Sequence, residues 1–228
     1  MNTWQVLYDL LSGFGLTLKL FGLTLLISIP LGLLFSVLCM TRFKPVSYLM
    51  KFIIWVVRGT PLLLQCVVVT FIPSVLFKIP NKDFANMLGI DTMADLQFAF
   101  VLIAFALNYA CYFAVIFEGG FKSIPRGQYE AGQVLGMTRT QIFFRVVLMQ
   151  MVRRIVSPMS NEVITLVKDT ALARALSVVE IIAIAYEKVN KYAVLTPLLY
   201  AGLFYLAFSG LLTLLFHFLE KKLSYYSV

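Results

Sequence analysis

Charged residues are scarce in this chain of 228 residues, of which Asp, Glu, Lys and Arg together make up 13%. Soluble domains carry about 25% charged residues, and the mean hydropathy here is high, at +0.89. The composition therefore excludes an ordinary soluble protein and predicts an integral membrane protein. The net charge of +8 then fits contacts with the headgroups of a lipid bilayer and not with nucleic acid.

Residue patterns that support catalysis or metal binding are also missing. The sequence shows no glycine-rich phosphate loop, no metal-ligand spacing and no acid–base cluster, so we expect no enzyme activity, no metal and no cofactor bound by this chain. Without a phosphate loop the chain cannot hydrolyse ATP itself. Cys39, Cys66 and Cys111 are odd in number and lie in separate apolar runs, which predicts buried thiols and not a disulfide.

Long apolar runs are what the sequence has in abundance. A helix needs roughly 20 apolar residues to cross a bilayer. Four runs approach or exceed that length: residues 14–40, 59–77, 98–117 and 195–219. A further run, residues 155–167, is short, only modestly apolar and interrupted by Glu162. The sequence therefore predicts an all-α integral membrane protein with five transmembrane helices.

Lys and Arg residues are divided unequally between the two sides of these spans. Twelve fall on the side that holds Lys44, Arg58 and Lys122, and six on the side that holds Lys82 and Lys188. The positive-inside rule makes the first side cytoplasmic, with the N-terminus outside and the C-terminus in the cytoplasm. Because no linker, repeat or low-complexity segment divides the chain, residues 1–228 are predicted to form a single transmembrane domain.

Residues 121–150 form the longest segment that is neither continuously apolar nor loop-like. Pro125 suits the first turn of a helix, and Gly136 is placed to end that helix at a positive φ. Thr138 and Gln141 then have the spacing of a capping box that begins a second helix. This basic helical hairpin between two spans predicts a contact surface in the cytoplasm.

The same hairpin resembles the EAA loop of ABC-importer permeases. That loop reads E-A-A, three residues, G, and later an apolar stretch followed by Pro; here Gly132 replaces the second Ala and Met149 stands where Pro is usual. In the family, the short helix after the acidic residue docks into a cleft of the ATPase subunit. The resemblance implies that the coupling segment comprises Glu130, Ala131, Gly132, Gly136, Met137 and Thr138.

Three further stretches are similar to motifs of the polar amino-acid permeases (histidine, glutamine and arginine types). They read VRGTPLLLQ at 57–65, SIPRGQYEA at 123–131 and KDTAL at 168–172. The resemblance implies the fold of an ABC type I importer transmembrane domain in a bacterial inner membrane. It also implies three kinds of partner: ATPase subunits that hold ATP and Mg²⁺, a second permease copy or paralogue in a homodimer or heterodimer, and an extracytoplasmic amino-acid-binding protein.

Polar residues within spans are costly, so each is a candidate for the path of an amino-acid substrate. A short, interrupted span is itself a pointer to a transport site. The candidates are Gln65, Asn108, Tyr112, Asn161, Glu162, Asp169 and Thr170. Asp169 is expected to be free for a substrate ammonium, with Thr170 beside it; a structural pair of Lys168 and Asp169 is the alternative. For Gln65 a bond to backbone freed by Pro61 is favoured.

Departures from the family pattern leave the transported amino acid open. Val115 replaces the family's acid, Glu118 replaces its basic residue, and Glu162 stands where an amide is common. The alternative function is a secondary carrier or channel without ATPase, but that would need an ion-coupling site and normally an internal repeat, and neither is visible. An inert scaffold would have no reason to bury polar residues in residues 155–167.

Overall fold

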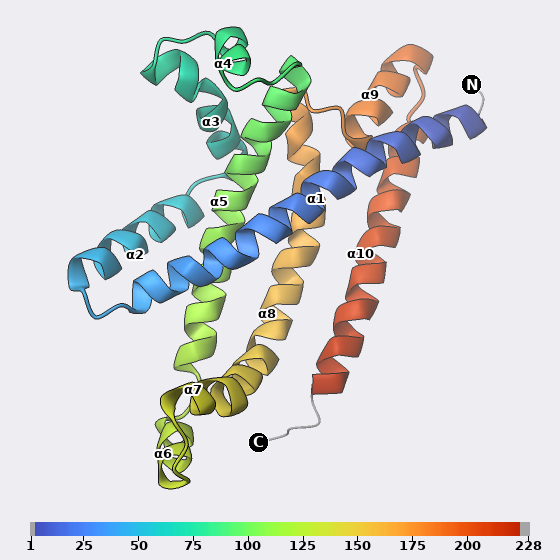
Figure 1. The fold of residues 1–228 in the computed structure, drawn as a ribbon. Coiled ribbons are helices and arrows are strands. Elements are labelled where there is room, and N and C mark those ends of the chain that lie inside the picture. The colour runs from blue at the N-terminus through green and yellow to red at the C-terminus, as the bar shows by residue number, and fades with distance from the viewer. Residues whose placement is uncertain (1–2, 224–228) are drawn as a thin grey trace.

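The computed structural model describes residues 3–223, and every regular element within that range is helical (Figure 1). Their bounds are α1 (Thr3–Met40), α2 (Lys44–Arg58), α3 (Leu62–Leu76), α4 (Asn81–Met87), α5 (Met93–Lys122), α6 (Arg126–Val134), α7 (Arg139–Ile142), the π-helical η1 (Phe143–Val147), α8 (Leu148–Asp169), the 3-10 helix η2 (Thr170–Leu176), α9 (Ile181–Tyr192) and α10 (Thr196–Leu223).

Helix α5 is the centre of the bundle. In the most apolar continuous stretch of 18 residues, 67% of the residues of α5 are buried inside the protein, against 11% for α10. Phe105, Tyr109 and Phe113 follow each other at four-residue spacing on α5 and are almost completely buried. Helices α1, α3 and α8 pack around α5, whereas α10 leaves most of its leucines exposed, as expected of a helix that faces lipid.

The long helix α1 crosses α5 at close range because small residues line the contact. Thr24, Ser28 and Gly32 recur every four residues along the buried face of α1. A methyl group at Gly32 would lie 2.7 Å from Phe113 Cβ and 3.0 Å from the Ala110 carbonyl oxygen. Small residues of this kind let helix backbones approach each other in membranes, so α1 braces the central helix.

Three described helices, α1, α5 and α10, are each long and apolar enough to cross a membrane. Helices α2 and α3 are long and apolar enough only when they are taken together, and they are bent by 108° against each other. Helix α8 has 22 residues, about 33 Å at roughly 1.5 Å per residue, and is long enough to span, but its charged residues exclude it from that set. The count of five spans includes α2–α3 and α8, and it stays a prediction.

Some predicted boundaries were wrong. The second span, expected over residues 59–77, is the 15-residue helix α3, because the chain breaks at Pro61. The fourth, expected over 155–167, is the 22-residue helix Leu148–Asp169, because the helix continues without a break from η1 through Arg153 and Arg154.

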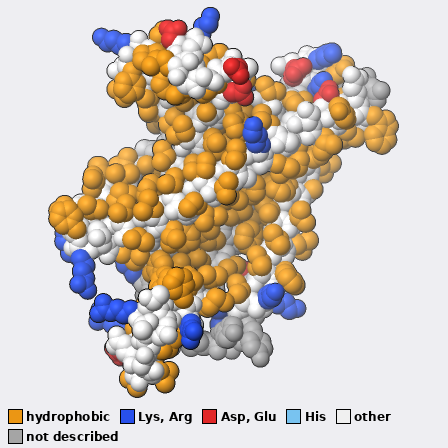
Figure 2. All heavy atoms as spheres, viewed as in Figure 1, with side chains coloured by type: hydrophobic (Ala, Val, Ile, Leu, Met, Phe, Trp, Pro, Cys, Tyr) orange, Lys and Arg blue, Asp and Glu red, His pale blue; other side chains and the backbone are white. Residues whose placement is uncertain are grey.

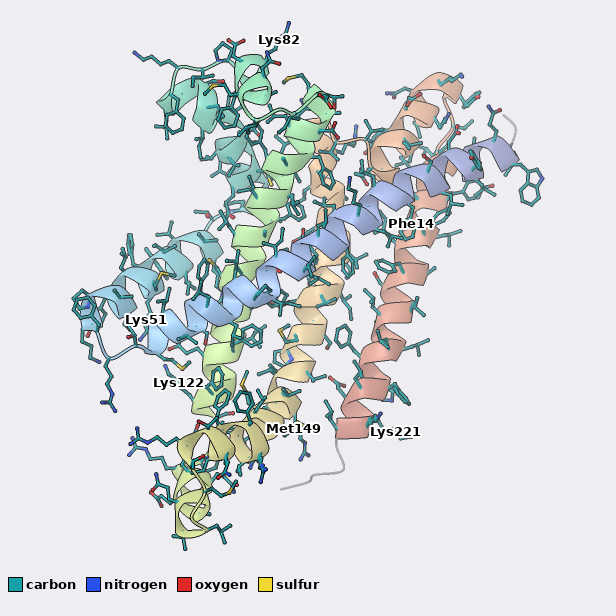
Figure 3. All side chains as sticks on the ribbon, viewed as in Figure 1. Phe14, Lys51, Lys82, Lys122, Met149 and Lys221 are labelled. Carbon is teal, nitrogen blue, oxygen red and sulfur yellow. The ribbon has the colours of Figure 1, made fainter. Side chains whose placement is uncertain are left out.

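The two ends of the bundle differ in charge as the sequence predicts. The N-terminal end of α1 lies with α4 and α9 at the upper end, and the hairpin of α6 and α7 lies with the end of α10 at the lower end (Figure 1). Figure 2 shows Lys and Arg around the lower end and most of the visible Asp and Glu at the upper end. Lys82 lies above, and Lys122 and Lys221 lie below (Figure 3). This arrangement fits the predicted orientation, which stays a prediction.

Candidate functional site

The hairpin of α6 and α7 is built as its sequence predicts. Helix α6 ends at Val134, and Gly136 in the turn has a φ of +72°. The Gly136 N–H donates to the Gln133 carbonyl, and the Met137 N–H donates to the Gly132 carbonyl. The capping box that begins α7 is present, with the Thr138 N–H donating to Gln141 Oε1 at 2.9 Å. The turn is therefore fixed by backbone geometry that favours glycine.

The packing of this hairpin requires Gly132, at the position where the family usually has alanine. It is buried between α6 and α7. A methyl group there would lie 2.6 Å from Ile142 Cγ1, so Ile142 would have to move. The close contact between the two short helices thus depends on glycine at this position.

The hairpin passes into α8 through a π-helical segment. Helix α7 runs into η1, and η1 into α8, without a loop. Phe143 in η1 stacks on Phe121 at the end of α5, with ring centroids 6.1 Å apart. A π turn accommodates one extra residue and redirects a helix, and the ribbon turns at this point (Figure 1). The change of direction therefore precedes Met149 and needs no proline there.

The tip of the hairpin exposes apolar side chains. Val134 is 87% exposed and Leu135 is 78% exposed, although both lie on the predicted cytoplasmic side. Glu130, Ala131, Gly136 and Thr138 are also exposed, whereas Gly132 is buried and Met137 is half-buried. Exposed apolar residues on a projecting hairpin mark an interaction site. Val134 and Leu135 were missed from the sequence, because apolar residues on one face of a helix usually pack against the protein.

At the break between α2 and α3, two of the predicted path residues meet. Asn108 Nδ2 donates to Gln65 Oε1 at 3.0 Å. Gln65 Nε2 in turn donates to the Val57 carbonyl at 2.7 Å and to the Thr60 carbonyl at 3.1 Å. Gln65 therefore satisfies backbone freed near Pro61, the role favoured from sequence, and it ties the break to α5.

Arg58 belongs to this polar region and not to the basic end of the bundle, where the positive-inside rule placed it. Its guanidinium lies over the ring of Tyr112, 4.9 Å from the centroid, because α2 runs from the α1–α2 turn back toward α5 before the 108° bend. Arg58 and Asp169 are the charged groups that act on the half-buried carboxylate of Glu162. Glu162 has no hydrogen-bond or ion-pair partner among the residues that the structure describes.

Asp169 is held by a residue that sequence reasoning missed. The Tyr109 hydroxyl donates to Asp169 Oδ2 at 2.7 Å, so one carboxylate oxygen is occupied. The expectation that the Asp169 side chain is free was therefore wrong for this oxygen. Lys168 is exposed and makes no ion pair with Asp169. The need of a membrane-embedded acid for a partner was a signal for such a residue, but 60 residues separate Tyr109 from Asp169.

Thr170 points into a different polar network. It is fully buried, and its hydroxyl donates to the Val167 carbonyl at 2.6 Å and lies 3.3 Å from the Tyr205 hydroxyl. Tyr205 donates to Glu180, which caps the first turn of α9 by accepting from the Ile182 and Ala183 N–H groups at 2.8 Å each. This network fastens η2, α9 and α10 together beside Asp169.

Asn161 stands apart from these pairs and is exposed on α8. It forms a row of polar side chains with Ser157 and Thr165 at four-residue spacing, and both of these are also exposed. The structure thus joins Gln65 to Asn108, Arg58 to Tyr112, and Tyr109 to Asp169, with Glu162 in the field of Arg58 and Asp169. These groups come from the α2–α3 break, α5 and α8.

Comparison with known proteins gives the chain relatives over nearly its whole length. Residues 28–225 match the family model of the binding-protein-dependent transport system inner membrane component. The chain is 31% identical to the octopine transport system permease protein OccM of Rhizobium radiobacter, covering 96% of this chain and 88% of that protein. It is 32% identical to the L-cystine transport system permease protein TcyB of Bacillus subtilis, covering 97% and 90%.

Solved structures share the arrangement of helices. A crystal structure of an amino acid ABC transporter with histidines matches with a TM-score of 0.78 at 25% identity, over 96% of this chain and 95% of the other. The MetNI methionine ABC transporter in an inward-facing conformation matches with a TM-score of 0.67 at 18% identity, over 98% and 99%. The second likeness shows the fold alone, which is that of ABC type I importer transmembrane domains.

Proposed function

Since the chain belongs to the family of binding-protein-dependent transport system inner membrane components, we propose that it is the permease subunit of an ATP-driven importer of a polar amino acid. Permeases of this family are not themselves catalytic; ATP is hydrolysed by separate subunits, and a second permease subunit completes the membrane part. Relatives named for the transport of octopine, L-cystine and arginine support an amino-acid substrate.

The observation that carries the proposal is the group of polar side chains where the α2–α3 break, α5 and α8 meet. In a bilayer such groups avoid lipid and line water-filled paths. The exposed row of Ser157, Asn161 and Thr165 on α8 supports this assignment, because a helix face with three exposed polar residues does not suit lipid. The path is therefore proposed to run along this face of α8.

An α-amino acid brings an ammonium and a carboxylate, and the polar region offers both counter-charges. Glu162 has a carboxylate without a hydrogen-bond partner in the described chain, so it is the first candidate for the ammonium, with the remaining oxygen of Asp169 as the second. Arg58 on Tyr112 is the candidate for the carboxylate. Asn108 and Gln65 hold this region in place, and Thr170 supports the segment that follows Asp169.

Coupling to the ATPase is proposed to occur through the hairpin. Val134 and Leu135 would enter an apolar cleft of the ATPase subunit, and Glu130 and Thr138 would lie at its rim. Fixed turn geometry at Gly136 and the direct run from α7 into α8 support this role, because movement of the hairpin then reaches α8 without a flexible joint. The upper end, with α4 and α9, is the candidate surface for an extracytoplasmic binding protein.

The experiment is uptake by the complete complex in proteoliposomes. The complex is purified with the partners that co-purify from its native cells and is loaded with ATP on the cytoplasmic side. The labelled panel comprises arginine, cystine, glutamate, aspartate, histidine and glutamine. Accumulation of at least one of them that requires ATP and the binding protein supports the proposal. Uptake that an ion gradient drives without ATP would establish the secondary carrier instead, and uptake of none would exclude these six amino acids as substrates.

A further inference from the structure

A hollow of about 560 Å³ opens where α6 meets the lower end of α8, outside the polar region described above. It is lined by Gln128, Arg145, Val146, Met149, Gln150, Arg153 and Arg154. Its volume falls within the range of roughly 300–1,000 Å³ that is usual for small-molecule sites. Three guanidinium groups and no carboxylate line it, so its chemistry favours an anion.

Hydrogen bonds hold the walls of this hollow in place, but two of the arginines that line it have no partner in the described part of the chain. Gln150 Nε2 donates to Gln128 Oε1 at 2.9 Å, which joins α8 to α6. Arg154 donates to the carbonyl of Ser123. Arg145 and Arg153 have no hydrogen-bond or ion-pair partner among residues 3–223. Two unpaired guanidiniums in a preformed hollow suit the two oxygens of one oxyanion.

The same face of α8 leads from the hollow to the polar region. Arg153, Ser157 and Asn161 lie at four-residue spacing on one row, and Arg154 and Glu162 lie on the next row. Arg153 and Asn161 are eight residues apart, or about 12 Å along the helix. Figure 3 shows Met149, on the wall of the hollow, at the lower end of α8 near the hairpin.

We infer that this hollow is a cytoplasmic exit site, where Arg145 and Arg153 bind the carboxylate of the amino acid that leaves the path. The inference rests on the proposed function and adds a second substrate contact to it. An anionic lipid headgroup offers the same oxyanion chemistry. The continuous row of exposed polar residues above the hollow favours the substrate, because that row would otherwise face acyl chains.

The test introduces a thiol on the wall of the hollow in a background without Cys39, Cys66 and Cys111. Met149→Cys is used because Met149 is 53% exposed and has no polar partner to lose; Val146→Cys is a second position should the first fail to assemble. Inside-out vesicles that contain the native complex are treated with anionic and cationic methanethiosulfonates of similar size. The anionic reagent should react about tenfold faster or more, because a basic cleft concentrates anions.

Protection separates the possible ligands. L-arginine at millimolar concentration should slow the reaction several-fold, whereas L-argininamide, which lacks the carboxylate, should not. Arg145→Gln with Arg153→Gln should abolish both the protection and the preference for the anionic reagent. Arg42→Gln, an exposed basic residue of the same predicted side that does not line the hollow, should change neither.

Several results would overturn the inference. Equal protection by acid and amide would exclude carboxylate recognition. Protection that appears in phosphatidylglycerol but not in phosphatidylcholine proteoliposomes, without any effect of L-arginine, would assign the hollow to lipid. A thiol that reacts only after removal of the ATPase would make it a protein contact. Each of these can occur while the complex still imports an amino acid, so they are distinct from a failure of the proposed function.

Discussion

Tyr109 on α5 donates a hydrogen bond of 2.7 Å to Asp169 at the end of α8, across 60 residues of sequence. This bond gives the partly buried acid its partner and fastens the C-terminal end of α8 to the central helix. Asp169 is followed directly by Thr170. The Thr170 hydroxyl lies within hydrogen-bond distance of Tyr205 on α10, and Tyr205 donates to Glu180 at the start of α9. The bond therefore fixes the position of the proposed path relative to the rest of the bundle.

Tyr109→Phe removes this hydroxyl while keeping the ring in the core. It leaves a partly buried carboxylate short of a donor, at a cost of about 1–3 kcal/mol. We expect a lower melting temperature of the purified complex in a thermal-shift assay, and slower uptake. Tyr48→Phe is the matched control, because Tyr48 is 68% exposed. Equal melting temperatures for the two variants would contradict a structural role of the bond.

Gly136→Val tests the turn of the hairpin. At a φ of +72° a β-branched side chain is strained by about 1–3 kcal/mol, and the turn should not keep its shape. We expect the variant to reach the membrane but to lose the ATPase on co-purification, and with it transport. Gly127→Ala, in open space on α6, should behave as wild type. Retained association in Gly136→Val would show that the turn is not needed for docking.

Gly132→Ala restores the residue usual in the family and tests the contact with Ile142. Because Ile142 must move, we expect weaker ATPase association than in wild type. Ile142→Ala removes Cγ1, the atom nearest to the new methyl group, and should restore part of the association in the double variant. A double-mutant cycle measures this coupling. Additive effects of the two changes would mean that Gly132 is not required by Ile142.

The orientation predicts which loops a membrane-impermeant thiol reagent can reach. In a background without native cysteines, Asp91→Cys should be labelled from outside intact cells, because Asp91 lies in the loop before α5 at the upper end. Gln128→Cys, in the hairpin, should be labelled only after permeabilisation. The reverse pattern would invert the topology and remove the hairpin from the cytoplasm.

The sequence predicts features whose interactions lie within a few residues of each other, and it does not predict contacts between distant residues. Gly136 and the Thr138–Gln141 capping box act within a few residues, and the structure has the predicted turn and cap. The pairs between Asn108 and Gln65 and between Tyr109 and Asp169 join residues 43 and 60 positions apart. Such pairs follow from helix packing, which periodicity does not specify.

The position of Arg58 also depends on helix packing and could not be predicted from the sequence. The positive-inside rule counts it as a cytoplasmic residue, because it follows a basic segment and precedes an apolar run. The bend of 108° between α2 and α3 carries it to Tyr112 on α5 instead. Pro61 indicates that a break occurs there, but not its angle, so the position of Arg58 could not be predicted from sequence.

Glu162→Gln tests the central claim most directly, because it keeps the size of the side chain and removes its charge. Uptake of the amino acid identified from the panel should fall sharply in proteoliposomes, while assembly with the ATPase and basal ATP hydrolysis stay at wild-type levels. Asp169→Asn should have a smaller effect, since its bond from Tyr109 can persist. Unchanged uptake kinetics in both variants, with ATP hydrolysis intact, would contradict a substrate path along α8.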